Sequence, residues 1–161
     1  MTEPRRLLRP AFQGDTGEAD VQLLASIAGL DDTPESRRHA LRTLATARVF
    51  VPVSAQVITT ETDRSTMDDK HAQMALVSIT GRDGRRAVPA FTSAAALLAW
   101  QPDLRPVPVE GARAARTAVD DGAAAMLVDP GQPTQLVVTG SELVQLAAVW
   151  TEATNREGAG A

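Results

Sequence analysis

The residues best suited to chemistry are crowded into one short stretch, Asp68-Asp69-Lys70-His71. Two carboxylates, an amine and an imidazole are groups that acid–base catalysis and metal binding use. However, this stretch lies in a polar segment between Thr59 and Gln73, and consecutive loop residues do not by themselves converge on one point. We therefore expect a solvated loop, with a small hydrolase or transferase that uses Asp68 and Asp69 as the alternative.

Other sources of catalysis are missing from the sequence. The chain has no cysteine, which excludes thiolate zinc sites, iron–sulfur clusters and cysteine nucleophiles. Its two histidines, His39 and His71, lack the HExxH spacing of metalloproteases. There is no G-x-S-x-G nucleophile motif and no glycine-rich phosphate loop. We predict no catalytic residue, no metal and no cofactor.

Basic side chains gather at Arg82, Arg85 and Arg86, beside a predicted turn. The chain as a whole carries a net charge of −4 and only five Phe and Trp residues, with no tyrosine. Direct nucleic-acid binding is not expected, because single strands bind through basic grooves with exposed aromatic rings. The three arginines are instead either solvated charge on the hairpin or the contact surface for an acidic protein partner. A ribosome-associated factor that uses them is a further alternative.

The elements that must position these residues follow from local patterns. In the N-terminal part, helices are predicted from Asp20 to Gly29 and after Thr33-Pro34-Glu35, where a hydroxyl cap precedes a proline and an acid. The first helix has helically spaced apolar residues at Val21, Leu24, Ala25 and Ala28. A strand follows at 49–53, and Pro52 favours an edge or strand end for it.

The rest of the chain alternates strands and helices. Asp83-Gly84 between the apolar runs 74–80 and 85–91 predicts an antiparallel hairpin. Helices are expected after Ser93, Gly111 and Gly140, and strands at 106–109, 124–128 and 136–138. Strands joined by helices run parallel and tightly turned strands run antiparallel, so the sheet is mixed.

The fold class predicted from this order is α/β (α+β): a single compact domain in which helices pack on a mixed β-sheet. We expect an extended arm over residues 1–17, the domain over 18–154 and a disordered tail over 155–161. No apolar run is long enough for a signal peptide or a membrane span, which predicts a cytoplasmic protein. Proline at the predicted strand edges favours a monomer or a weak homodimer.

The segment Ala87-Val88-Pro89-Ala90-Phe91-Thr92-Ser93 is the most specific part of a family resemblance. With Trp100, Arg105-Pro106-Val107-Pro108-Val109 and Leu127-Val128-Asp129-Pro130-Gly131, it resembles the SseB N-terminal domain, in the short form found in GC-rich bacteria. The similarity covers about residues 10–150. Asp129 departs from the asparagine often found at this position in the wider family.

This resemblance implies a small α/β domain without an established activity, catalytic residue or cofactor, and it suggests a translation-linked partner. The segment Phe91-Thr92-Ser93 runs from a strand end into a helix, where backbone N–H groups can receive an anion. Phe91, Thr92, Ser93 and Asp129 are therefore candidate ligand-binding residues. The competing interpretation is that Phe91 fills the core and Ser93 caps the helix.

Together these observations predict a non-catalytic binding or adaptor domain. It would act through a protein partner at Arg82, Arg85 and Arg86, and through a small anionic ligand at the Thr92–Ser93 end of the sheet.

Overall fold

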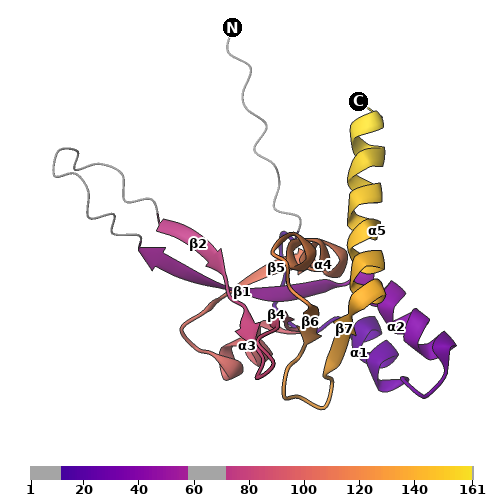
Figure 1. Cartoon of the computed structure of the whole chain (residues 1–161), viewed down its shortest axis with the longest axis horizontal. Coiled ribbons are helices and arrows are strands. Elements are labelled where there is room, and N and C mark those ends of the chain that lie inside the picture. The colour runs from indigo at the N-terminus through magenta and orange to yellow at the C-terminus, as the bar shows by residue number, and fades with distance from the viewer. Residues whose placement is uncertain (1–11, 58–71, 161) are drawn as a thin grey trace, which may run out of the picture.

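The computed structural model describes residues 12–57 and 72–160 (Figure 1). The helices within these residues are α1 (Val21–Ala28), α2 (Pro34–Thr46), α3 (Ala94–Trp100), α4 (Gly111–Asp120) and α5 (Gly140–Ala159). The strands are β1 (Arg48–Val57), β2 (Ala72–Leu76), β3 (Ile79–Thr80), β4 (Arg86–Ala90), β5 (Arg105–Glu110), β6 (Ala125–Val128) and β7 (Leu136–Thr139).

The strands form two sheets that meet at one bridge. One sheet has the order β2-β1-β5 and is antiparallel, and the other has the order β3-β4-β6-β7. In the second sheet β4 and β6 are parallel, whereas β3–β4 and β6–β7 are antiparallel. Phe50 and Phe91 exchange two backbone hydrogen bonds of 2.7 and 2.8 Å, which join the sheets. The predicted class, a single α+β domain with a mixed sheet, is confirmed.

Most of the core lies where α1, α2, α4 and α5 pack together and on one face of the strands. Alternate strand residues point into it, among them Val88, Met126 and Val138, because side chains in a strand alternate between faces. A smaller cluster lies on the opposite face, where Leu97 of α3 packs with Phe50 and Phe91. The Phe91 and Trp100 rings are 5.4 Å apart there.

Gly111 sets how closely α4 approaches α2. A Cβ atom at this position would lie 1.9 Å from the Leu44 carbonyl oxygen, so only glycine fits. The Gly111 N–H also donates to the Ala47 carbonyl at 2.9 Å. The start of α4 is thereby held against the end of α2.

The prolines are accommodated by register. Pro52 faces Pro106, and Phe50 faces Pro108, across β1 and β5. The Phe50 N–H and carbonyl point to Phe91, so the Phe50–Pro108 pair needs no hydrogen bond between its members. The nitrogens of Pro106 and Pro108, which carry no hydrogen, therefore face away from β1. The edge prediction for Pro52 was wrong, because β1 lies between β2 and β5.

The predicted hairpin is only partly formed. Ile79 and Thr80 pair with Ala87 and Arg86 around the Asp83-Gly84 turn, as expected. The residues before them, 72–76, instead pair with β1 as β2. One apolar run therefore contributes a strand to each sheet. The pairing of its first part is set by β1 and not by the Asp83-Gly84 turn.

Two further expectations need correction. In α1 the buried side chains are Leu23, Ser26 and Ile27, whereas Val21 is 78% exposed. Both sides of this short helix are apolar, so spacing alone does not select the side that packs on α2. The tail predicted as disordered from residue 155 is helical to Ala159, where Arg156 and Glu152 form an i,i+4 ion pair.

Candidate functional site

Asp129 follows β6 at the end of the parallel strand pair β4–β6. Its backbone has a φ of 46°, a left-handed conformation that Asp and Asn tolerate better than most residues. The Asp129 N–H donates to the Ala90 carbonyl at 2.8 Å, and its carbonyl accepts from the Gln132 N–H at 3.0 Å. The residue is 1% exposed, so its carboxylate needs internal partners.

Two threonines supply those partners. The Asp129 carboxylate accepts hydrogen bonds from the Thr92 N–H at 2.8 Å, the Thr92 hydroxyl at 2.7 Å and the Thr134 hydroxyl at 2.6 Å. Among the described residues, every buried side-chain nitrogen or oxygen has a hydrogen-bond partner. The structure thus brings Thr92 and Asp129 together, as a closed network that fastens the end of β4 to the β6–β7 turn.

The other predicted members of this site have structural roles. Phe91 is fully buried in the smaller core cluster. The Ser93 hydroxyl accepts from the Ala96 N–H at 3.1 Å and caps α3. An anion here would have to displace the Asp129 carboxylate from the Thr92 N–H. The observed bonds therefore favour the competing interpretation of Phe91 and Ser93.

Arg48 is a central residue of this region that sequence reasoning missed. Its side chain forms an ion pair with Asp15 at 2.7 Å, and it donates to the carbonyls of Glu18 and Thr92, the latter at 2.9 Å. The guanidinium also lies 4.3 Å from the centre of the Phe50 ring. Arg48 and Asp15 are only 13% and 15% exposed. No local motif marks such a residue, since its partners come from distant segments.

The three hairpin arginines have different surroundings. Arg85 pairs with Asp83 at 2.8 Å, and this contact lowers the pKa of Asp83. Arg86 donates to the Asp121 carbonyl and pairs with its carboxylate at 3.3 Å, at the end of α4. Arg82 is exposed. The three arginines are therefore close in sequence but differ in their contacts.

A hollow of about 220 Å³ lies beside this hairpin. Its floor includes Ala87, Ala125 and Leu127, and Arg85 and Arg86 are at its margin. These floor residues alternate with core residues along β4 and β6, so they belong to the face opposite α4 and α5. Val137, opposite Leu127 in the register, continues this face and is 39% exposed.

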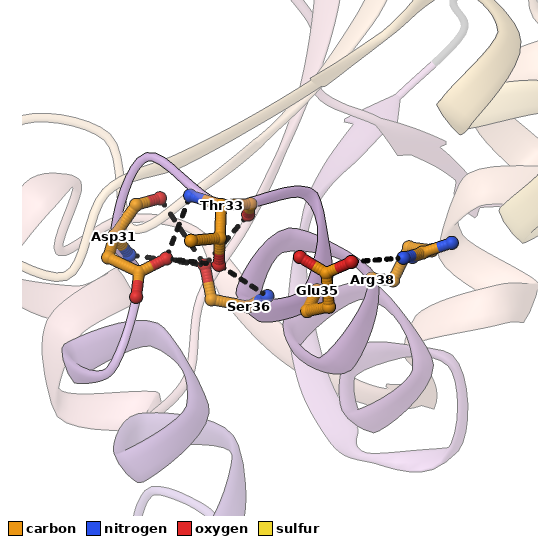
Figure 2. A network of polar contacts seen from close by, with 5 residues as sticks. All are labelled: Asp31, Thr33, Glu35, Ser36 and Arg38. Atoms are coloured by element: carbon orange, nitrogen blue, oxygen red, sulfur yellow. Dashed lines mark hydrogen bonds and ion pairs between the residues drawn. The ribbon is translucent and has the colours of Figure 1, made fainter.

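A polar network precedes α2 (Figure 2). The Asp31 carboxylate accepts from the Ser36 hydroxyl at 2.6 Å and from the Thr33 N–H at 2.8 Å, while Thr33 caps the helix. The Ser36 and Thr33 hydrogen bonds lower the pKa of Asp31 to about 2. The Ser36 hydroxyl therefore links Asp31 to the first turn of α2.

Other predicted chemistry falls outside these observations. Asp68, Asp69, Lys70 and His71 lie outside the described residues. Within residues 12–57 and 72–160, no three His, Asp or Glu side chains gather where they could hold a metal ion. In the same ranges, no helix has the length and apolar character needed to cross a membrane.

Comparison with known proteins identifies a family for this chain. The model of the family described as SseB protein N-terminal domain matches residues 21–145. This range includes β1–β7, α1–α4 and the first part of α5. No curated protein and no solved structure gives a significant match.

Proposed function

Because the chain belongs to the SseB protein N-terminal domain family, whose description names a domain and no reaction, we propose from its surface that it is a non-catalytic protein-binding domain. The observation that carries this proposal is the partly exposed sheet face beside the β3–β4 hairpin, which we call the open sheet face. Ala125, Leu127 and Val137 present apolar side chains there, next to Arg85 and Arg86.

The chemistry of this face supports a protein partner. Apolar strand residues bordered by arginines combine burial of apolar area with directional polar contacts, a common composition of protein interfaces. The Arg85–Asp83 and Arg86–Asp121 pairs are exposed by 44% to 75%, so solvent screens them. A partner's acids can therefore compete for these arginines at small cost.

The polar network at Asp129 argues against catalysis at that site. Its three donors are committed to one carboxylate, and the site is closed to solvent. A hydrolase that uses Asp68 and Asp69, and a ribosome-associated factor that uses the hairpin, are the alternatives that the experiment must separate.

The test is affinity capture with the full chain from extract of its native cells, followed by binding measurements with the purified partner. Two variants alter the face: Val137→Glu, and the triple variant Arg82→Ala, Arg85→Ala, Arg86→Ala. Two controls lie outside this face, Val144→Glu on α5 and Arg116→Ala on α4. Val144 is 58% exposed, and Arg116 pairs with Asp120 within α4 in the described structure.

We expect both face variants to lose a protein that the wild type and both controls retain. Titration calorimetry with that purified protein should then show binding to the wild type and not to Val137→Glu. If the retained material is ribosomal and RNase releases it, the ribosome-associated alternative replaces the proposal. Substrate turnover that is lost in Asp68→Asn, Asp69→Asn would overturn the non-catalytic proposal.

A further inference from the structure

A second apolar hollow lies between α2 and α5, on the other side of the sheet from the face described above. Its volume is about 530 Å³. Leu41 and Ala45 of α2 and Leu146 and Val149 of α5 form its apolar part. Val149 is 42% exposed, so the hollow opens to solvent. We name this feature the α2–α5 groove.

The groove has the geometry of a space between two helical ridges. Arg38, Leu41, Arg42 and Ala45 follow the i, i+3, i+4, i+7 spacing that places residues on one side of a helix. Gln145, Leu146 and Val149 form the corresponding ridge of α5. The α2 ridge extends over two turns, about 10 Å, which is enough to hold the apolar side of a short helix.

The charged residues that line the groove indicate which kind of partner segment it can bind. Both charged residues that line it, Arg38 and Arg42, are cations, and the α5 ridge contributes only uncharged side chains. Arg38 pairs with Glu35 at 2.9 Å, but the two side chains are 61% and 74% exposed, so this pair is weak and exchangeable. Nearby Arg37 is already held by Glu142 at 2.6 Å. The groove therefore complements an apolar segment with acidic flanks.

We propose that the α2–α5 groove binds an acidic amphipathic helix of a partner protein. Apolar residues at i, i+3 or i+4, and i+7 of that helix occupy the space above Leu41, Ala45, Leu146 and Val149. Its carboxylates pair with Arg38 and Arg42 at the margin. This surface is distinct from the open sheet face and does not depend on it. A domain with both surfaces can connect two proteins.

The probes are two designed helical peptides of identical apolar pattern, with leucines at i, i+3, i+4 and i+7. One carries glutamates beside the leucines, and the other carries lysines at the same positions. Fluorescence anisotropy with the full chain should show binding of the glutamate peptide and at least about tenfold weaker binding of the lysine peptide. Amide shifts of the wild type should change along 38–46 and 145–149.

Variants test the two components of the groove separately. Arg38→Glu combined with Arg42→Glu should reverse the preference between the two peptides. Val149→Asp should weaken binding of the glutamate peptide by about tenfold or more, because it places a charge on the apolar contact. The matched control is Val144→Asp, on the same helix and outside the groove lining, which should leave affinity within about twofold.

Several results would overturn the proposal. These are equal affinity for the two peptides, no binding of the glutamate peptide, or shifts that gather on the open sheet face. A concentration-dependent dimer that Val149→Asp dissolves would show instead that a second copy covers the groove. Shift mapping uses the wild type, so the test remains decisive if a variant fails to fold.

Discussion

Thr92 donates two hydrogen bonds to the Asp129 carboxylate, one from its backbone N–H at 2.8 Å and one from its hydroxyl at 2.7 Å. The two residues are 37 positions apart and follow the neighbouring parallel strands β4 and β6. Their contact fixes the end of the sheet at the point where α3 begins. Asp129 is therefore expected to contribute to the stability of the fold.

Removal of the Asp129 carboxylate should destabilise the fold. Asp129→Ala leaves the buried Thr92 N–H and two hydroxyls without their acceptor, at a cost of about 3 kcal/mol in the free energy of unfolding. Asp129→Asn keeps an acceptor and suits the left-handed backbone, so we expect a loss of about 1 kcal/mol. Urea denaturation measures both values. Equal losses in the two variants would contradict the proposed role of the carboxylate.

Arg48 should hold the segment that precedes α1. Arg48→Ala removes its contacts with Asp15 and with the carbonyls of Glu18 and Thr92, so amide hydrogens of residues 15–20 should exchange faster. Arg48→Lys should restore little of the protection, because an ammonium group cannot reproduce the guanidinium fork. Exchange rates in α5 provide the internal control. Unchanged protection at residues 15–20 in Arg48→Ala would show that the segment is held by other contacts.

Two of the helical glycines, Gly111 and Gly158, should respond oppositely to substitution by alanine. Gly111→Ala forces a methyl group against the Leu44 carbonyl, and we expect a loss of about 3 kcal/mol or more in unfolding free energy. Gly158→Ala meets open space within α5 and should gain up to about 1 kcal/mol, since alanine favours the helix. Thermal unfolding of both variants tests this contrast. A Gly111→Ala protein as stable as the wild type would disprove the close approach of α2 and α4.

Acid titration should identify the Asp31 network. Hydrogen bonds from Ser36 and Thr33 lower the pKa of Asp31 in the folded chain from 3.8 to about 2. A lowered folded-state pKa contributes stability above pH 4, and this contribution is lost as the pH falls toward 2. Carboxyl carbon resonances measure the pKa directly.

In Ser36→Ala, the pKa of Asp31 should rise toward its ordinary value. The pKa of Glu142 is lowered by hydrogen bonds from the Arg37 side chain and not by Ser36, so it provides the reference within the same titration. An unchanged pKa of Asp31 in this variant would assign the shift to Thr33 instead.

The sequence by itself determined the local parts of this protein. Thr33 and Ser93 cap helices as their residue types and positions predicted, and Asp83-Gly84 forms the turn of the hairpin. Each feature depends on contacts within a few residues, so a short window of sequence contains the information. The same holds for the family resemblance, which rests on such segments in order.

Only the tertiary structure decided which distant segments contact one another. It placed β1 between β2 and β5, turned Leu23 and Ile27 of α1 inward, and brought Arg48 to Thr92, 44 positions away. It also closed the Asp129 carboxylate within three hydrogen bonds and left the α2–α5 groove open. These outcomes depend on burial and register between separate elements, which no local pattern contains.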